Sequence, residues 1–392
     1  MGKRFEILVL NQISQVGLKR LPADAYAVSK DAARPDAILV RSADMHAMSI
    51  PPSVQAIGRA GAGTNNVPVA EMSKRGVPVF NAPGANANAV KELVLAGMLI
   101  AARNLVPAVQ FVAGLRGNDA ALSMRVEEEK KRFAGIELPG HTLGVIGLGK
   151  IGSLVADAAI RLGMNVVGYD PEITVDAAWS LPSQVRKAHS IEEVLKASHF
   201  VTLHVPLNNA TQHLVNENAL AHVRPGAILL NFSREGIVDD RAVVGALSAN
   251  RLRAYVTDFP TALLAGHEGV VALPHLGAST REAEDNCAVM VVDQMRDYLE
   301  HGSIRNAVNF PDVVMQREAP FRVAIANANV PNMLGQISTA MARAGLNIHN
   351  MLNKSKGEMA YTLVDADSRV PKETIDTIRR IDGVLAVRYL PS

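Results

Sequence analysis

A glycine-rich turn between a strand-like and a helix-like segment constrains the fold of this chain more than any other feature. The turn follows the apolar run 142–147 and leads into a helical pattern over 150–163. Its pattern is G-x-G-x-x-G, formed by Gly147, Gly149 and Gly152. A second strand-like segment, 165–169, ends at the acid Asp170, which lies 18 residues after the last glycine. This combination predicts a Rossmann-type, doubly wound α/β domain that binds a dinucleotide.

Each residue of this motif has a physical role in holding a dinucleotide. Gly147 allows the tight turn, Gly149 lets the backbone approach the pyrophosphate, and Gly152 lets the helix pack closely on the strand. The free amides of the helix N-terminus then face the phosphates. Asp170 can accept hydrogen bonds from the adenosine ribose hydroxyls and would repel a 2′-phosphate, so NAD is favoured over NADP as the cofactor.

The rest of the chain predicts further α/β structure on both sides of this motif. Short apolar runs alternate with helical segments, a rhythm that predicts parallel sheets covered by helices. We expect strands at 5–10, 37–41, 55–59, 77–80, 142–147, 165–169, 199–204, 227–231, 253–257 and 270–273. A long helical pattern covers 87–116 with Pro107 as its main breaker, and another covers 279–301. After an irregular linker, residues 321–392 follow the order βαββαβ, which is ferredoxin-like.

Composition and charge exclude several classes of function. The 392 residues carry 40 basic and 38 acidic side chains, a net charge of +2, so no nucleic-acid partner is expected. The longest apolar stretch, 93–102, is too short to cross a bilayer, so no membrane partner is expected. One cysteine, Cys287, and an N-terminus without a signal-peptide pattern favour a cytoplasmic protein. No residues have metal-ligand spacing, so no metal is expected.

An arginine and a histidine follow expected strands of the dinucleotide domain. Ligands of such sheets bind at the carboxyl ends of the strands, where Arg234 follows 227–231 and His275 follows 270–273. An arginine supplies paired donors for a substrate carboxylate. A histidine titrates near neutrality and can take the proton of a hydroxyl while hydride leaves the carbon. The pair predicts hydride transfer to or from a 2-hydroxy acid, with Arg234 and His275 as the catalytic residues.

Five segments, in this order, resemble the D-2-hydroxyacid dehydrogenase superfamily. They are GRAG at 58–61, GLGKIG at 147–152, NFSREGIVD at 231–239, PHLGAST at 274–280 and NAVN at 306–309. Within the superfamily they resemble most closely the phosphoglycerate dehydrogenase branch with a C-terminal ACT domain. The resemblance implies NAD-dependent oxidation of D-3-phosphoglycerate to 3-phosphohydroxypyruvate, the first step of L-serine biosynthesis.

The resemblance also implies a domain organisation with one domain inserted into another. A Rossmann-type NAD domain at 96–278 would interrupt a flavodoxin-like substrate domain at 1–95 and 279–305. A linker at 306–320 and an ACT domain at 321–392 would follow. We expect a homodimer through the NAD domain, or a homotetramer if the ACT domains also pair.

Further residues are assigned to substrate and cofactor by the same resemblance. Arg59 and Arg41 match substrate-contacting arginines, and Asn86 matches an asparagine of the substrate loop. Clustered cations would distinguish a phosphorylated 2-hydroxy acid from lactate or glyoxylate. Asp258 matches the residue that hydrogen-bonds the nicotinamide carboxamide. Other expected cofactor contacts are Lys150, Ile151, Val205, Pro206, Phe232, Ser233, Gly277 and Ala278.

One departure from the family pattern concerns the partner of the catalytic histidine. The family has a glutamate five residues after the position of Asp258, where this chain has Leu263. A leucine cannot orient the imidazole or stabilise its protonated form, so we expect reduced activity unless Glu268, the nearest acid in sequence, replaces it. Leu263 keeps open an NAD-binding regulatory protein with little activity. A hydroxypyruvate/glyoxylate reductase or other D-2-hydroxyacid dehydrogenase is a second alternative, of the same class as the expected enzyme.

The segment 321–392 resembles a domain type that binds amino acids between paired copies. Asn327, Asn329 and Asn347 match its polar effector positions, which makes L-serine a candidate effector. The family's loop glycine is Asn332 in this chain. A dimerisation module without a ligand is therefore the alternative.

Overall fold

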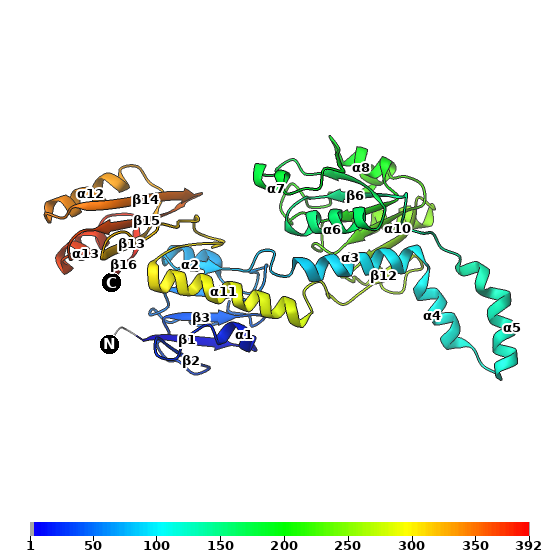
Figure 1. Cartoon of the computed structure of the whole chain (residues 1–392), viewed down its shortest axis with the longest axis horizontal. Coiled ribbons are helices and arrows are strands. Elements are labelled where there is room, and N and C mark those ends of the chain that lie inside the picture. The colour runs from blue at the N-terminus through cyan, green and yellow to red at the C-terminus, as the bar shows by residue number, and fades with distance from the viewer. Residues whose placement is uncertain (1–3, 392) are drawn as a thin grey trace. The chain divides into compact units, whose positions relative to one another are not determined.

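The computed structural model describes residues 4–391 and divides into two compact units. The inserted unit is the continuous segment Ala87–Thr280 (Figure 1). The split unit combines Met1–Asn86 with Arg281–Ser392. Each unit contains a parallel sheet, and the split unit also carries an antiparallel sheet at its C-terminal end.

The sheet of the inserted unit consists of seven parallel strands. They are β6 Thr142–Ile146, β7 Asn165–Tyr169, β8 Val185–Lys187, β9 Phe200–Leu203, β10 Ala227–Asn231, β11 Leu252–Thr257 and β12 Val270–Ala272. All residues of β9 and β10 are buried, as expected where helices cover both faces. The strand order is β12-β11-β10-β9-β6-β7-β8. The chain reverses direction of winding between β6 and β9, and ligands of such sheets bind at this switch point.

Helices connect these strands. They are α3 Ala87–Ala102, α4 Leu105–Gly114, α5 Asp119–Glu129, η1 Lys130–Phe133, α6 Lys150–Arg161, α7 Val175–Trp179, α8 Ile191–Ala197, α9 Glu217–Ala221 and α10 Asp240–Ser248. Side-chain caps begin several of them; for example, Asp239 accepts the N–H of Arg241 at the start of α10. A Cβ on Gly97 of α3 would lie 3.0 Å from the Phe232 ring, so this glycine lets α3 pack closely on the end of β10.

The helical pattern expected over 87–116 is divided into two helices. α3 ends at Ala102, Asn104 adopts a left-handed conformation with φ 49°, and α4 begins at Leu105. Pro107 lies in the first turn of α4, where a missing N–H is tolerated, so the break comes earlier than this proline. No single helix among residues 4–391 is long and apolar enough to span a membrane, and α3 with α4 would qualify only together, across a 63° bend.

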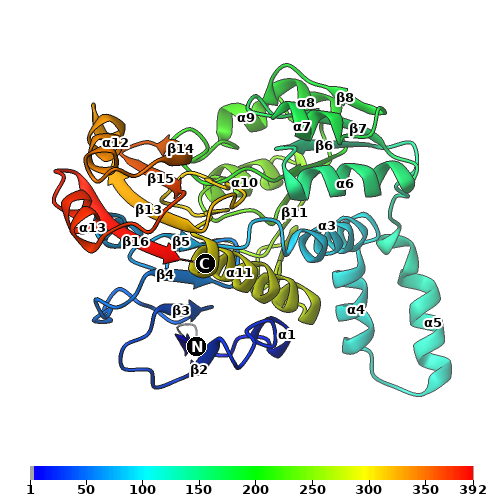
Figure 2. The same cartoon turned by 60° about the vertical axis from the view of Figure 1, so that its left-hand side comes forward.

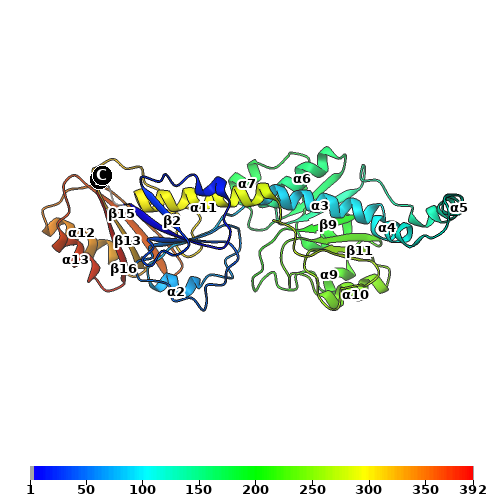
Figure 3. The ribbon, with the colours of Figure 1, turned by 90° about the horizontal axis from the view of Figure 1, so that it is seen from below.

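The helices α4 and α5 form an arm that extends from the body of the inserted unit (Figure 3). Neither helix has a buried residue. Large apolar side chains are exposed along the arm, including Val109 at 67%, Val112 at 57% and Met124 at 63%. The arm therefore presents an apolar surface that its own unit does not cover.

The parallel sheet of the split unit has five strands. They are β1 Phe5–Leu10, β2 Tyr26–Ser29, β3 Ala37–Val40, β4 Ala56–Arg59 and β5 Val79–Phe80, with helices α1 Gln15–Leu18, α2 Val69–Lys74 and α11 Arg281–His301. The strand order β2-β1-β3-β4-β5 is flavodoxin-like. A Cβ on Gly58 of β4 would lie 2.7 Å from Met295 Sδ, so glycine lets α11 pack closely on this strand.

The C-terminal domain, residues 321–391, has the predicted βαββαβ order. Its elements are β13 Phe321–Ala328, α12 Met333–Arg343, β14 Ile348–Lys356, β15 Met359–Ala366, α13 Lys372–Arg379 and β16 Val384–Pro391. The antiparallel order is β14-β15-β13-β16, with both helices on one face (Figure 2). On the other face, Tyr361 and Leu363 join the core that contains Tyr298 of α11. The predicted α/β fold class is confirmed.

Candidate functional site

The glycine-rich turn connects β6 to α6 at the carboxyl end of the strand. Gly147 has a φ of 91° and donates its N–H to the Tyr169 carbonyl at 2.8 Å. A Cβ on Gly152 would lie 1.9 Å from the Gly147 carbonyl oxygen, so only glycine allows α6 to approach the turn. A Cβ on Gly149 would have nothing within 4 Å. The turn therefore keeps open space at Gly149, as the approach of a pyrophosphate requires.

The first turn of α6 and the residue after β7 extend this cradle. Lys150 and Ile151 begin α6, and the first N–H groups of a helix have no acceptor within it. Asp170 Oδ2 accepts the N–H of Leu148 at 2.8 Å, and Oδ1 accepts the N–H of Glu172 at 3.0 Å. These bonds hold the carboxylate beside the turn. The residues present therefore fit a dinucleotide, with Asp170 as the group that would hold the ribose hydroxyls.

The loops after β9 and β10 meet the glycine turn at the switch point. A Cβ on Gly147 would lie 2.6 Å from the His204 carbonyl oxygen, so the turn packs directly on the loop after β9. The Ser233 hydroxyl donates to the Val205 carbonyl at 2.5 Å and joins the two loops. These loops carry four of the expected cofactor contacts, Val205, Pro206, Phe232 and Ser233.

His204 is a half-buried residue directly after β9 with one deeply buried ring nitrogen. Its Nε2 lies 3.0 Å from Thr202 Oγ1, whereas Nδ1 is buried without a hydrogen-bond partner among residues 4–391. Burial lowers the pKa of His204 to about 3, so the ring is neutral at physiological pH. The sequence placed this histidine only by its position directly before Val205, an expected cofactor contact.

Arg234 lies on the loop after β10. Asn231 stabilises this loop by donating to the Arg234 carbonyl at 3.0 Å and by accepting the N–H of Ser233 at 3.1 Å. The guanidinium is exposed, and Nη1 donates to the Ser233 carbonyl at 2.7 Å. Arg234 is therefore a surface cation at the carboxyl edge of the sheet, and its other N–H groups can bind an anion.

His275 lies on the loop after β12, at the same edge of the sheet. It has a φ of 42°, and its N–H donates to the Asp258 carbonyl at 2.9 Å. Its exposed ring packs against Phe259 with the ring centroids 4.9 Å apart. Asp258 Oδ2 accepts the N–H of Gly277 at 2.9 Å. Asp258 therefore holds the histidine loop at two points.

The other carboxylate oxygen of Asp258 has unused hydrogen-bonding capacity. The residue is 1% exposed, and Oδ1 is buried without a partner among the residues that the structure describes. Burial raises the pKa of Asp258, and the N–H of Gly277 and the charge of His275 oppose this shift. A buried acceptor without a donor fits the amide N–H of a nicotinamide carboxamide. Ala278, the last expected contact, is half-buried on the same loop.

Leu263 occupies the family glutamate position, and Glu268 is the acid expected to replace that glutamate beside His275. Leu263 is 45% exposed, while its neighbour Leu264 is buried in the core at 1%. Glu268 lines a cavity with Gly226, at the amino ends of β10 and β11. His275 follows the carboxyl end of β12. Glu268 therefore lies at the opposite edge of the sheet and does not replace the family glutamate.

In the split unit, Arg41 and Arg59 lie at the carboxyl ends of neighbouring strands. β3 and β4 pair in register with Arg59 opposite the last residue of β3, so Arg41 is one residue further. A Cβ on Gly61 would lie 1.7 Å from Arg59 Nη1, so this glycine makes room for the guanidinium. Arg41 Nη2 lies 2.7 Å from Oε1 of Glu284, an acid of α11 that the sequence analysis did not identify. Asn86 is half-buried directly before α3.

The three expected effector residues make hydrogen bonds within the C-terminal domain. Asn327 is buried in β13 and donates to a neighbouring backbone carbonyl at 2.8 Å. Asn329 donates to the Gly357 carbonyl at 3.1 Å. Asn347 donates to Asp367 Oδ2 at 2.5 Å. An effector at these positions would have to exchange with such bonds.

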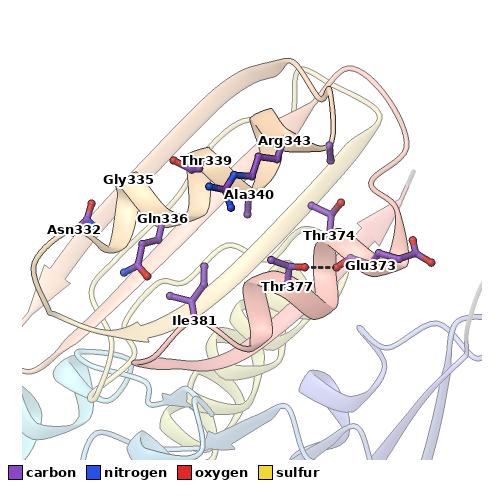
Figure 4. A pocket seen from close by; sticks show the side chains of 11 residues that line it. Asn332, Gly335, Gln336, Thr339, Ala340, Arg343, Glu373, Thr374, Thr377 and Ile381 are labelled. Carbon is purple, nitrogen blue, oxygen red and sulfur yellow. Dashed lines mark hydrogen bonds between the residues drawn. The ribbon is translucent and has the colours of Figure 1, made fainter.

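A separate cavity of about 690 Å³ lies between α12 and α13. Figure 4 shows Gln336 and Arg343 of α12 and Glu373 and Thr377 of α13 around it. Asn332, with φ 61°, lies at its end before α12. All five side chains are exposed, so the cavity is an open groove. It contains none of the three expected effector residues.

Residues 95–277 match the family model for the NAD binding domain of D-isomer specific 2-hydroxyacid dehydrogenases. The chain is 34% identical over 344 residues to the D-3-phosphoglycerate dehydrogenase of Methanocaldococcus jannaschii, covering 85% of this chain and 60% of that protein. It is 31% identical over 348 residues to the D-3-phosphoglycerate dehydrogenase of Escherichia coli K12, covering 86% and 81%.

A solved structure supports the same fold. The NAD⁺-bound 3-phosphoglycerate dehydrogenase of Entamoeba histolytica superposes with a TM-score of 0.61 at 23% identity, covering 78% of this chain and 98% of that one.

Proposed function

We propose that this chain, which belongs to the family of D-isomer specific 2-hydroxyacid dehydrogenases, oxidises D-3-phosphoglycerate to 3-phosphohydroxypyruvate with NAD. This reaction is the first step of L-serine biosynthesis. The observation that carries the proposal is the position of Arg234 and His275 at the carboxyl edge of the NAD binding sheet. Arg41 and Arg59 support a phosphorylated substrate, because guanidinium groups bind phosphate through paired donors.

The chemistry follows from these side chains. Bound NAD supplies the nicotinamide carbon that accepts a hydride from C2 of the substrate. His275 takes the proton of the 2-hydroxyl on a neutral ring nitrogen, so the carbon loses two electrons and the oxygen becomes a carbonyl. Arg234 binds the carboxylate and orients C2. The residues that would hold NAD are Lys150, Ile151, Asp170 and Asp258.

Two alternative functions would require different sets of these residues. A hydroxypyruvate/glyoxylate reductase would use Arg234 and His275 but needs no cation for a phosphate. An NAD-binding regulatory protein with little activity is favoured by Leu263, because Glu268 lies at the other edge of the sheet. Turnover itself separates the regulator from both enzymes.

Reduction of NAD by D-3-phosphoglycerate tests the proposal directly. We expect turnover with the D isomer and a loss of at least about 100-fold in kcat for His275→Gln, because general-base catalysis contributes that much. Arg234→Gln should raise KM and lower kcat. The exposed His222 offers a matched control, and His222→Gln should leave the rate unchanged. Turnover that survives both active-site substitutions would contradict the assignment.

We also propose that the chain forms a homodimer through the α4–α5 arm. The arm exposes Val109, Val112 and Met124 and has no buried residue of its own. A dimer would cover this apolar surface. Sedimentation should show a dimer that Val109→Asp dissociates, whereas Val175→Asp, at an equally exposed site outside the arm, should not. A homotetramer would form if the C-terminal domains also pair.

The C-terminal domain is proposed to be an ACT domain with L-serine as its effector. Asn329 and Asn347 are exposed amides at loops of the domain, whereas Asn327 is buried in β13 and donates to the Ala328 carbonyl. Calorimetric titration with L-serine should show saturable heat that Asn347→Ala weakens. Absence of heat in the intact protein would favour a dimerisation module without a ligand.

A cytoplasmic location is part of the same proposal. The single cysteine, Cys287, is buried and forms no disulfide, which fits a reducing compartment. Fractionation of cells that produce the full chain tests this directly.

A further inference from the structure

The two arginines of the split unit form one cationic position at the edge of its sheet. Arg59 ends β4 and Arg41 follows β3, and the register of the two strands places these residues side by side. Gly61 leaves the space that the Arg59 guanidinium occupies. The backbone therefore holds two guanidinium groups at the carboxyl edge of this sheet.

Arg41 is already paired with an acid. Its Nη2 lies 2.7 Å from Oε1 of Glu284, with the two side chains 34% and 42% exposed. Partly exposed ion pairs contribute little net stability and can exchange partners with an anion from solution. With Glu284 included, the formal charge of the group is +1, one less than that of the two arginines alone.

The position of Glu284 is determined by the helix that carries it. Asp285, the next residue of α11, accepts a hydrogen bond from the Ser14 hydroxyl in the loop after β1. Further along α11, Asp293 accepts from Arg20 Nε at 2.5 Å. Both contacts tie α11 to the residues that flank α1 in the split unit. Glu284 is therefore held close to Arg41 by a fixed helix and not by a mobile loop.

Cys287 lies within the electrostatic reach of the same three charges. Burial raises the pKa of its thiol, the charges of Arg59 and Arg41 oppose this shift, and Glu284 reinforces it. The buried Cys287 thiol, one turn beyond Glu284 on α11, therefore lies near all three charges. The acid belongs to the same electrostatic environment as both arginines.

We propose that Glu284 is a specificity-determining residue, a built-in counter-ion that Arg41 must exchange for the phosphate of the substrate. This inference rests on the proposed function and deepens it. A phosphate competes with Glu284 for Arg41, so Glu284 weakens binding of phosphorylated acids. A substrate with an uncharged tail leaves the Arg41–Glu284 pair intact. Glu284 therefore reduces the preference for the phosphorylated substrate below the value that the same site would give without this acid.

Substitution by glutamine removes the charge and keeps the size of the side chain. For Glu284→Gln we expect KM for 3-phosphohydroxypyruvate to fall roughly three- to fivefold, the effect of one partly exposed ion pair. KM for hydroxypyruvate and both kcat values should stay unchanged. Glu282→Gln is the matched control, because Glu282 is an exposed acid on the same turn of α11, and it should resemble the parent.

A double-mutant cycle identifies Arg41 as the group that responds. Arg41→Gln should raise KM for the phosphorylated substrate, and Glu284→Gln should have no further effect in that background. Calorimetric titration of the cofactor-free protein with 3-phosphoglycerate and D-glycerate should reproduce the same pattern without turnover. Thermal unfolding of each variant verifies that the fold is retained.

Several results would overturn the inference. These are an unchanged or raised KM for the phosphorylated substrate in Glu284→Gln, an equal fall for hydroxypyruvate, or an effect that persists with Arg41→Gln. Failure of the proposed function gives a different result, namely a parent protein that neither binds nor turns over the phosphorylated substrate. A parent that does so with an inert Glu284→Gln rejects only the role of Glu284.

Discussion

Arg322 and Asp365 form a bidentate ion pair inside the C-terminal domain. The distances are 2.6 Å from Nε to Oδ1 and 2.8 Å from Nη2 to Oδ2, and neither side chain is exposed. Arg322 also donates to the His301 carbonyl at 3.0 Å and to the Gln316 carbonyl at 3.1 Å. One arginine therefore connects the antiparallel sheet, the segment before it and the end of α11.

Loss of one partner should be far more costly than loss of both. We expect Arg322→Met to lower the free energy of unfolding by about 3–5 kcal/mol, because it leaves a buried carboxylate without its counter-ion. Arg322→Met with Asp365→Leu should recover much of this loss. Urea denaturation measures both effects. A single variant within about 1 kcal/mol of the parent would contradict the stabilising role of the pair.

Two glycines of the dinucleotide turn should respond differently to the same substitution. Gly149→Ala places a methyl group in open space at an ordinary φ of −69°, so stability should be unchanged while NAD affinity falls at least about tenfold. Gly152→Ala places it 1.9 Å from a carbonyl oxygen, so stability should fall as well. Calorimetry and thermal unfolding separate the two effects. Unchanged NAD binding in Gly149→Ala would exclude this turn as the phosphate site.

Local patterns were sufficient to predict most of the fold. The apolar runs and the glycine turn indicated the strands that became β6, β7 and β10, because both faces of these strands are buried. The βαββαβ order of the C-terminal domain was also legible from alternating apolar positions. The short edge strands β2 and β8 were missed, because β2 has only four residues with two of them exposed and β8 consists mainly of exposed charged residues. The break between α3 and α4 depends on the left-handed backbone of Asn104, which the sequence pattern did not predict.

The parts of the site that could not be predicted depend on contacts between distant segments. Arg41 and Glu284 are far apart in sequence, and only the packing of α11 on the sheet joins them. Glu268 is close to His275 in sequence, yet β12 runs between them and separates them to opposite edges. Residues distant in sequence can therefore be in contact, and residues close in sequence can lie at opposite edges of a sheet.

The neutral His204 should make the protein sensitive to acid. Its folded-state pKa of about 3 lies below the ordinary 6.5, so the unfolded chain binds a proton first as the pH falls. The stability that neutral His204 contributes is complete above pH 6.5 and is lost as the pH falls toward about 3. Relative to His204→Gln, the parent should lose up to about 1.4 kcal/mol per pH unit between roughly pH 6 and 4. If urea denaturation showed the same pH dependence of stability for the parent and His204→Gln, this prediction would be refuted.

Restoring the family acid should increase activity. In Leu263→Glu a carboxylate near His275 would stabilise the protonated ring, so a higher pH is needed to free the base. The low-pH limb of kcat/KM for oxidation should therefore move upward by roughly one pH unit, with a higher maximal rate. The exposed Leu162 provides the control Leu162→Glu. Superimposable pH profiles of parent and Leu263→Glu would show that the loop keeps this side chain away from His275.

One ratio tests the proposed function most directly, namely kcat/KM for 3-phosphohydroxypyruvate divided by kcat/KM for hydroxypyruvate. Both values are measured side by side through NADH oxidation, with glyoxylate as a third substrate. The cations at Arg41 and Arg59 predict a ratio above about ten, since one charge-assisted contact to the phosphate supplies that factor. Substitution of Arg59 by glutamine should lower the ratio roughly tenfold, because it removes one of the two cations. Equal or faster turnover of the unphosphorylated substrates by the parent protein would contradict a phosphoglycerate dehydrogenase.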